Sequence, residues 1–383
     1  MVYKLSLPCI RYLFLWTILL YLSVCYISRN IPSMLALQLS KKKTIRSPDE
    51  DPVDFTCIWS AVDEREKCKP NCKPGYFGLY GMRSCHPLLT CEEVGELNIS
   101  SEIGNQGFVK EVWQSSWNSF PVVVKKLRRH DIGGIIARPG FFRGIDLMKN
   151  SPQRSVLLQL VGQCNDTIVT EIHPLLDARY LETRLKEYPQ YNTLSTRMKL
   201  CISYVDILRV LHSGIDKRIY VQCDARSLNK LTGQFLLTED FRLVLSDVDS
   251  MEAIILNETS RRLIKCTDWG QVTGYFPAPE ELWPYTGMFD ASRMPLYDEK
   301  IEIWKILDMC LSFLGDDHSA LKVKRSLKEI HKWCKNPNPR KRPSAEEVLH
   351  AYVRVLRDVI KSRVNILLSP FGLDTPAMQS LSH

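Results

Sequence analysis

Three polar side chains in the middle of the chain have the types and the spacing that phosphoryl transfer requires. Asp224 is followed five residues later by Asn229, and Asp247 follows an apolar run twenty-three residues after Asp224. Phosphoryl transfer needs from a protein mainly an acceptor that orients the attacking hydroxyl and oxygen ligands for a divalent metal ion. We therefore expect Asp224 to be the base, Asn229 to act beside it as a metal ligand, and Asp247 to ligate a metal ion that bridges the phosphates.

An Ala-Pro-Glu triplet that ends at Glu280 follows these residues, at the place where the activation segment closes in protein kinases. Two parts of the kinase pattern differ here. No His-Arg pair precedes Asp224, and the usual Asp-Phe-Gly is Asp-Val-Asp, with Asp249 two residues after Asp247. Because alternate residues of a strand share a face, Asp249 is expected to assist in holding the metal. An aspartate in a loop is more often a turn residue, and the spacing to Ala-Pro-Glu is what favours the catalytic interpretation.

Glu280 also gives a structural test of this interpretation. In protein kinases the glutamate of Ala-Pro-Glu pairs with a buried arginine that lies before the last helix. Arg342, in the stretch KRPSAEEV, occupies the corresponding place in this sequence. We therefore expect an ion pair between Glu280 and Arg342 that supports the fold and takes no part in the chemistry.

A segment with two glycines lies where a phosphate-binding loop is expected. Gly104 and Gly107 are placed between two predicted strands, and a glycine backbone can approach phosphate groups closely. The third glycine of the usual pattern is absent, and Lys110 stands in its place. By itself such a loop is equally consistent with an ordinary hairpin, so the prediction depends on the residues downstream.

Two lysines compete for the role of holding the phosphates of ATP. Lys125 ends a Val-Val-Val-Lys run that is similar to the Val-Ala-Ile-Lys strand of protein kinases. Lys110 lies one strand earlier, as the corresponding lysine does in the with-no-lysine kinases. The sequence does not decide between them. The acidic partner of such a lysine is also left open among Glu102, Glu111 and Asp146.

The elements that must position these residues change in kind along the chain. The predicted strands are at residues 108–113, 121–125, 168–173, 233–237 and 242–245, with a turn at 115–119. The predicted helices are at residues 196–212, 300–314, 321–334 and 345–362. A small strand-rich part followed by a helical part predicts an α+β fold of the bilobal, protein-kinase-like type.

The N-terminal residues predict a membrane anchor and a luminal body. Residues 12–27 form an uninterrupted apolar run, and the absence of a small-x-small cleavage site favours an uncleaved signal anchor over a cleaved signal peptide. Three glycosylation sequons follow, at Asn98, Asn165 and Asn257. Five cysteines crowd into residues 57–91, and behind a signal anchor they favour disulfides over a zinc site.

The charge and the segment pattern divide the chain further. A formal net charge of +8, spread along the sequence, is typical of a solvated surface and speaks against nucleic acid as a partner. The expected parts are a cytoplasmic tail (1–11), a transmembrane signal anchor (12–29), a luminal stem (30–55), a cysteine-rich collar (56–95), a kinase-like catalytic domain (96–365) and a C-terminal tail (366–383).

With these residues in place, the chain resembles the protein O-mannose kinases, a family of secretory-pathway glycan kinases. The matching stretches are CKPGYFGLYGMRSCHPLLTC, GFVKEV, the Cys-Asp pair at 223–224, SDVDS, APEELWPY, YDEKIEIWKI and HKWCK with RPSAEEVL, within residues 68–360. The resemblance implies a type II membrane protein of the endoplasmic reticulum that uses ATP with Mg2+ or Mn2+. It further implies phosphate transfer to the 6-hydroxyl of O-linked mannose in a GalNAc-GlcNAc-mannose trisaccharide on α-dystroglycan.

The resemblance also accounts for the missing His-Arg, because the family has a cysteine before the base, as Cys223 is here. We expect Cys223 to form a disulfide with Cys266 that braces the active-site segment. Two alternatives are a secretory-pathway protein kinase that acts on Ser, Thr or Tyr, and an inactive pseudokinase that serves as a binding module. The pseudokinase is disfavoured because Asp224, Asn229 and Asp247 are all present.

Overall fold

The computed structural model describes residues 41–47, 50–103, 109–128, 131–150, 156–214, 217–257, 260–267 and 270–368. The chain divides into two units, Met1–Lys41 and Lys42–His383, and the second contains the elements discussed below. The expected cytoplasmic tail and transmembrane anchor, residues 1–29, lie outside the described residues. Within the described ranges, no helix is long and apolar enough to cross a membrane.

The N-terminal part is built on an antiparallel sheet with strand order β6-β7-β8-β10-β9. Its strands are β6 (Asn98–Glu102), β7 (Lys110–Trp117), β8 (Phe120–Leu127), β9 (Leu160–Cys164) and β10 (Thr167–Glu171). The expected turn at 115–119 is wrong in extent, because β7 continues to Trp117. The chain reverses at Asn118 and Ser119, both with positive φ, as in the tight turns that suit the twist of a hairpin.

The cysteine-rich collar packs onto this sheet through disulfides and short strands. The elements of the stem and the collar are β1 (Lys41–Ser47), β2 (Glu50–Ser60), β3 (Arg65–Pro70), β4 (Tyr76–Phe77), β5 (His86–Pro87) and α2 (Cys91–Gly95). The pairs are Cys57–Cys68, Cys72–Cys85 and Cys91–Cys164, so all five collar cysteines are in disulfides and the zinc alternative is wrong. Residues expected to form a polar stem lie in β1 and β2.

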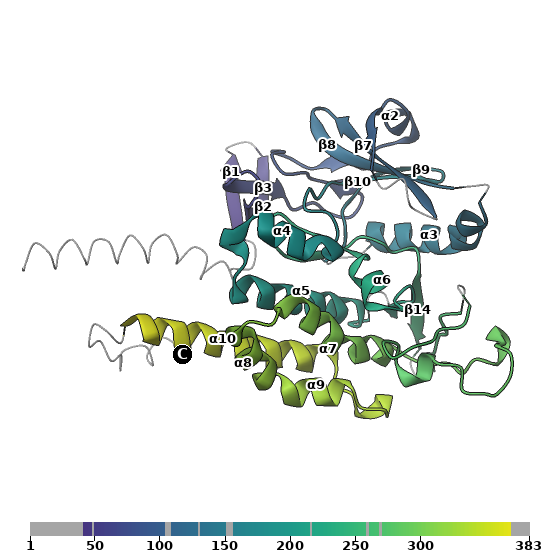
Figure 1. Cartoon of the computed structure of the whole chain (residues 1–383). Coiled ribbons are helices and arrows are strands. Elements are labelled where there is room, and N and C mark those ends of the chain that lie inside the picture. The colour runs from purple at the N-terminus through teal and green to yellow at the C-terminus, as the bar shows by residue number, and fades with distance from the viewer. Residues whose placement is uncertain are drawn as a thin grey trace, which may run out of the picture. The chain divides into compact units, whose positions relative to one another are not determined.

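Helix α3 (Ile132–Asn150) connects β8 to the rest of the sheet, and the sequence pattern does not predict it. Figure 1 shows it below the sheet, on the side of the helical part. Its glycines bring the helix backbone against the segment that carries the Asp-Val-Asp motif. A Cβ atom on Gly140 would lie 1.8 Å from the carbonyl oxygen of Asp249, and one on Gly144 would lie 2.6 Å from Cγ2 of Val248. Only residues without a side chain permit this approach.

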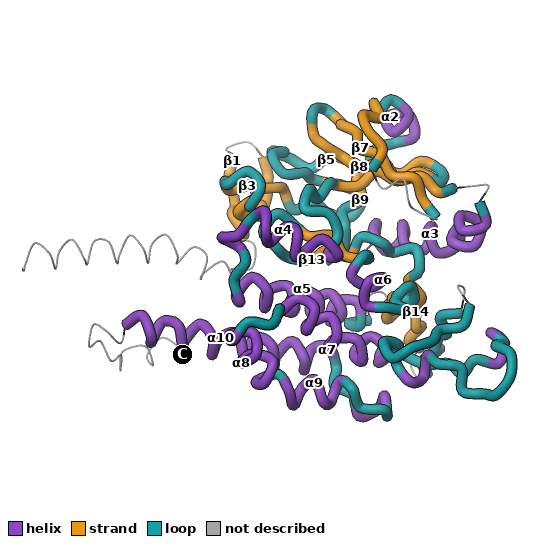
Figure 2. Tube along the Cα trace, viewed as in Figure 1, coloured by secondary structure: helices purple, strands orange, loops and turns teal. Residues whose placement is uncertain are grey.

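The C-terminal part is mostly helical (Figure 2). Its helices are α4 (Leu181–Glu187), α5 (Leu194–Leu211), α6 (Leu228–Thr232), α7 (Lys300–Leu314), α8 (His318–Ser326), α9 (Lys328–Cys334) and α10 (Ala345–Leu368). Its strands are β11 (Arg218–Gln222), β12 (Phe235–Leu237), β13 (Leu243–Leu245), β14 (Met251–Leu256) and β15 (Arg261–Arg262). The single helix expected at 321–334 is wrong, because Asp317 caps a helix that begins at His318 and that ends before a second one starts at Lys328.

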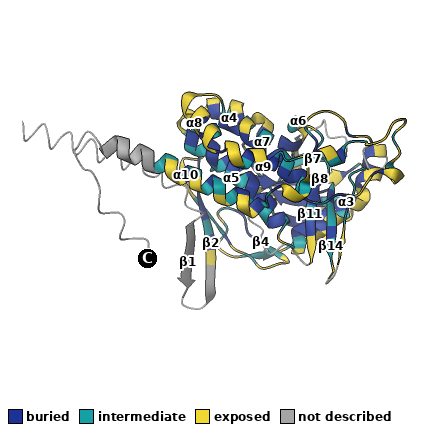
Figure 3. Ribbon diagram, turned by 90° about the horizontal axis from the view of Figure 1, so that it is seen from below, coloured by how far each residue is buried: buried dark blue, intermediate teal, exposed yellow. Residues whose placement is uncertain are grey.

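Helix α5 is the centre of this part. Thr193 caps it by accepting a hydrogen bond from the backbone N–H of Thr196, and apolar residues such as Met198 and Leu208 recur on the face that is buried. In Figure 3 much of the ribbon of α5 and α7 has the colour of buried residues. A strand-rich N-terminal part followed by this helical part is a mixed α/β arrangement that is consistent with a kinase-like fold.

Candidate active site

Asp224 lies in the loop between β11 and α6, at the end of a strand that pairs with β14. Its side chain is only 14% exposed, and its Oδ2 is 2.8 Å from the Nζ of Lys230. Ser227 caps α6 and thereby starts the short helix that carries Asn229, whose side chain faces solvent. The structure therefore places the expected base in a partly enclosed position and Asn229 on the helix beside it.

Asp247 and Asp249 meet at the ammonium group of Lys110. The Nζ of Lys110 is 2.9 Å from Oδ1 of Asp247 and 2.7 Å from Oδ2 of Asp249. Burial by itself would lower the pKa of Lys110, but the two carboxylates outweigh it and raise that pKa. Lys110 is thus a firmly protonated cation between the two aspartates that the sequence assigns to metal binding.

Lys125 is buried close by but has a different environment. Its nearest polar contact in the structure is weak, with Nζ 3.4 Å from the hydroxyl of Ser246. Burial and the positive charge of Lys110 lower the pKa of Lys125 to about 8. In the register of the sheet Lys125 lies opposite Val112, two residues along β7 from Lys110. The two lysines that compete in the sequence are therefore neighbours, and only Lys110 contacts the aspartates.

Two glutamines that the sequence analysis missed connect the segments that carry Asp224 and Asp247. The amide of Gln222 donates to the backbone carbonyl of Asp247 (2.7 Å) and accepts from the backbone N–H of Asp224 (3.1 Å). The side-chain amide of Gln234 donates to the backbone carbonyl of Asp224 (3.2 Å), while the backbone carbonyl of Gln234 accepts from the backbone N–H groups of Ser246 and Asp247. Both glutamines are buried. No local sequence pattern points to these contacts, because each glutamine joins two segments that the sequence separates.

Cys223, which precedes the base, is in a disulfide with Cys266, as expected. The backbone N–H of Gln222 donates to Oε1 of Glu302 on α7 (3.1 Å), and Oε2 of Glu302 is 2.7 Å from the Nε2 of His212 at the end of α5. The missing His-Arg pair is thus replaced by a glutamine that bonds to the Asp247 segment and by a cysteine that links covalently to residue 266.

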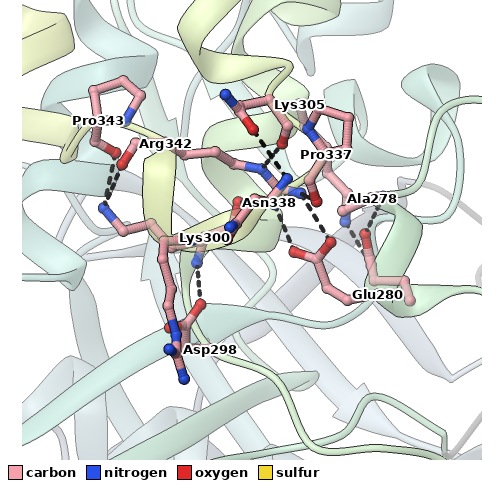
Figure 4. A network of polar contacts seen from close by, with 12 residues as sticks. Ala278, Glu280, Asp298, Lys300, Lys305, Pro337, Asn338, Arg342 and Pro343 are labelled. Carbon is pink, nitrogen blue, oxygen red and sulfur yellow. Dashed lines mark hydrogen bonds and ion pairs between the residues drawn. The ribbon is translucent and has the colours of Figure 1, made fainter.

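The expected ion pair of Glu280 with Arg342 is present (Figure 4). Arg342 donates to both carboxylate oxygens of Glu280, at 2.5 and 2.8 Å, and also to the carbonyl of Lys300 at 2.9 Å. Its guanidinium is fully buried and lies 5.0 Å from the centre of the Trp304 ring. The neighbouring Glu281 pairs with Lys305 at 2.8 Å. These contacts fix the Ala-Pro-Glu segment to α7 and to the loop before α10.

The remaining sequence candidates stay apart from the two lysines or cannot be placed. Gly104 and Gly107 lie outside the described residues, as does any contact of the loop between them. Glu111 pairs with Arg128 at 3.3 Å, and Asp146 is exposed on α3, so neither is the partner of Lys110 or Lys125. That role belongs to the aspartates themselves.

The donor atoms at this site suit a hard divalent cation in the company of a nucleotide. Carboxylate and amide oxygens, here from Asp247, Asp249 and Asn229, are the ligands that Mg2+ and Mn2+ prefer. Among the residues that the structure describes, no group of three or more His, Cys, Asp or Glu side chains is arranged to hold a metal alone.

The sequon asparagines lie at the surface. Asn98 begins β6, Asn165 lies in the turn between β9 and β10 with positive φ, and Asn257 follows β14. All three side chains are exposed. Their positions leave room for attached glycans.

The chain is similar to proteins named protein O-mannose kinase. Protein O-mannose kinase of Gallus gallus is 36% identical over 296 residues, which are 76% of this chain and 81% of the relative. The protein of the same name from Macaca fascicularis is 36% identical over 320 residues, or 81% and 87% of the two chains. That from Homo sapiens is 36% identical over 309 residues, or 78% and 85%. No protein-family model matches the chain.

Proposed function

The chain belongs to the protein O-mannose kinase family, and on that basis we propose that it transfers the γ-phosphate of ATP to the 6-hydroxyl of an O-linked mannose. It is an ATP-dependent phosphotransferase of a protein-kinase-like, bilobal fold. The observation that carries the proposal is the pair of carboxylates, Asp247 and Asp249, gathered round Lys110 and joined to the Asp224 loop through Gln222.

Each of these residues has a defined task in the proposed reaction. Asp224 accepts the proton of the attacking mannose hydroxyl and orients its oxygen. Its carboxylate is held by Lys230 and Gln234, which fix the direction in which it accepts the proton. The segment of Asp247 is fixed relative to that base by the amide of Gln222, so acceptor and phosphate ligands keep one geometry.

Asp247 and Asp249, with Asn229, would hold a divalent cation, Mg2+ or Mn2+. When bound, that ion neutralises charge on the β- and γ-phosphates of ATP. Lys110 is the residue that we assign to the phosphates, because it contacts both aspartates and keeps its proton. Lys125 has a lowered pKa and no contact with either aspartate among the described atoms, so it is assigned a supporting role.

The acceptor and the location follow the family. We assign as acceptor a GalNAc-GlcNAc-mannose trisaccharide on an α-dystroglycan-like glycoprotein. The disulfides and the exposed sequons support a catalytic domain, residues 96–365, in the secretory lumen. The apolar residues 12–29 are assigned as a signal anchor in the membrane of the endoplasmic reticulum, with residues 1–11 in the cytoplasm.

The test uses the full chain in detergent with radiolabelled ATP, Mg2+ and the synthetic trisaccharide. Labelled trisaccharide with phosphate on the mannose 6-hydroxyl is the expected product, and Asp224→Asn should remove it while the melting temperature is retained. Asparagine has nearly the shape of aspartate, and the Lys230 side chain is 53% exposed, so the ammonium group keeps water as a partner and the substitution should cost little stability. Labelled Ser, Thr or Tyr peptide with unlabelled sugar would replace the proposal by a protein kinase, and no transfer to either acceptor would leave a binding module.

A further inference from the structure

Two cysteines outside the four disulfides lie against each other in the core of the helical part. Cys201 is on α5 and Cys310 is on α7, and both side chains are almost completely buried. Their sulfur atoms are 2.7 Å apart, against about 2.05 Å in a disulfide. Cys334 on α9 is also buried but has no such partner among the described cysteines.

The surroundings of the two sulfur atoms differ in the folded chain. Burial raises the pKa of Cys201, and the neighbouring Cys310 raises it further. Burial would also raise the pKa of Cys310, but hydrogen bonds from Cys201, His331 and Tyr352 outweigh it and lower that pKa to about 6. His331 and Tyr352 are themselves buried and hydrogen-bonded to each other at 2.6 Å. Cys310 is therefore the residue that loses its proton first, and a thiolate is the form that attacks a disulfide.

The rest of the chain shows the chemistry of its compartment. Among the described residues, eight cysteines are paired in four disulfides, a density typical of secreted proteins and rare in the cytosol. In such a compartment, two thiols that fold into mutual contact meet the same oxidants as the other pairs. This argument does not depend on the proposed kinase activity.

We propose that Cys201 and Cys310 form a further disulfide that links α5 to α7 in the mature protein. The thiolate of one of the two cysteines attacks the disulfide of a luminal dithiol–disulfide oxidoreductase, and the other cysteine then displaces that enzyme from the mixed disulfide. The two cysteines lose two electrons and two protons in forming one S–S bond. The oxidoreductase takes up the two electrons and the two protons, and its disulfide becomes a dithiol. Because the sulfur atoms are enclosed in the folded chain, the exchange takes place before α5 and α7 dock completely.

The link would brace the helices that hold the loop of Asp224. The end of α5 carries His212, whose ring contacts Glu302 on α7, and Glu302 in turn accepts from the backbone of Gln222. A covalent bond between the same two helices closes a loop of 109 positions along the chain. Cross-links that close long loops constrain the unfolded state strongly. We therefore expect it to stabilise the catalytic part against heat.

Peptide mapping of the full chain, expressed through a secretory pathway, tests the bond directly. The protein is denatured without reductant, alkylated and digested, and then compared with a reduced sample. We expect Cys201 and Cys310 to be unlabelled and to appear in one cross-linked peptide, while Cys334 is alkylated in both samples. Full alkylation of Cys201 and Cys310 in the unreduced sample, with the four other pairs intact, would overturn the proposal.

Thermal unfolding of three variants gives a second, independent measurement. With a disulfide, Cys201→Ala or Cys310→Ala lowers Tm by roughly 5–10 °C, and the double variant unfolds within about 2 °C of either single one, since the first substitution already removes the link. Cys334→Ala is the control, because it measures how far Tm falls when a buried cysteine outside any disulfide is replaced. If each of the three single substitutions lowers Tm equally and the pair is additive, Cys201 and Cys310 are only packed thiols and the proposal is wrong.

Discussion

Replacing Gln222 by leucine should separate the positioning of the two aspartate segments from the stability of the fold. Gln222 is buried, and its amide bonds to the backbone of Asp224 and of Asp247 at 3.1 and 2.7 Å. Leucine has a similar volume but no polar atoms. The substitution therefore removes both bonds and leaves the N–H of Asp224 and the carbonyl of Asp247 without this partner.

The size of the effect follows from those two groups. A buried donor or acceptor left unsatisfied costs about 1–3 kcal/mol, so with two such groups Gln222→Leu should lower the free energy of unfolding by about 2–6 kcal/mol. Any relief of that cost requires the two segments to move until their backbone groups find other partners. A displacement on the order of 1 Å between reacting groups costs about 100-fold in rate. We expect kcat to fall by about that factor.

Gln159→Leu is a matched control. Its amide also bridges two backbone groups, since it donates to the carbonyl of Gly78 at 2.8 Å and accepts from the N–H of Gly78 at 3.1 Å. That contact lies between the collar and the sheet. We therefore expect a comparable loss of stability with kcat within about threefold of the unsubstituted protein.

The assay measures kcat and the KM for ATP of each protein at 20 °C, where circular dichroism shows that it is folded, and the free energy of unfolding in urea. A positioning role predicts that Gln222→Leu lowers kcat far more than Gln159→Leu at equal stability. If both variants lose equal stability and both keep kcat within threefold, Gln222 is only a packing residue and the reasoning is refuted.

Other substitutions test neighbouring features of the site. Lys110→Ala should raise the KM for ATP at least tenfold in initial-rate measurements, whereas Lys125→Ala should change it less; the reverse order would exchange their roles. Deprotonation above pH 8 removes the charge of Lys125, whereas Lys110, with its raised pKa, stays charged. If Lys110 binds the phosphates, the KM for ATP should therefore stay constant from pH 7 to 9. A rise of about tenfold in that KM would identify Lys125 as the phosphate ligand. Gly140→Ala should lower kcat and raise the Mg2+ concentration that gives half-maximal activity, because the new Cβ would lie 1.8 Å from a backbone oxygen of the Asp-Val-Asp segment. Gly95→Ala is the control, since a Cβ there would have nothing within 4 Å. Equal activity of the two variants would contradict the prediction for Gly140. Arg342→Ala should cost about 3–5 kcal/mol in urea unfolding, since it leaves a partly buried carboxylate unpaired, and a cost under 1 kcal/mol would show that the pair is dispensable.

Most of the helical part could be predicted from the sequence, because its patterns are local. Helix α7 has the predicted bounds and α5 differs from them by two residues at its start and one at its end, since apolar residues at helical spacing recur over several turns. Helix α3 could not be predicted, because it contains Pro139 and several glycines, which usually end a helix. The glycines of α3 are explained by a contact with a distant segment, because Gly140 and Gly144 allow the backbone of the Asp-Val-Asp segment to approach the helix.

The sequence by itself determined the order of the candidate site residues, from Asp224 to Asp249, and of the structural Glu280 after them, because their spacing along the chain is a local property that needs no partner. The pairing of Cys223 with Cys266, which is predicted because both cysteines are expected to be luminal, is confirmed. Only the tertiary structure decided that Lys110, and not Lys125, contacts the aspartates. That choice depends on the register of two strands and on a loop 137 positions away, and contacts between distant segments leave no periodic signal in the sequence.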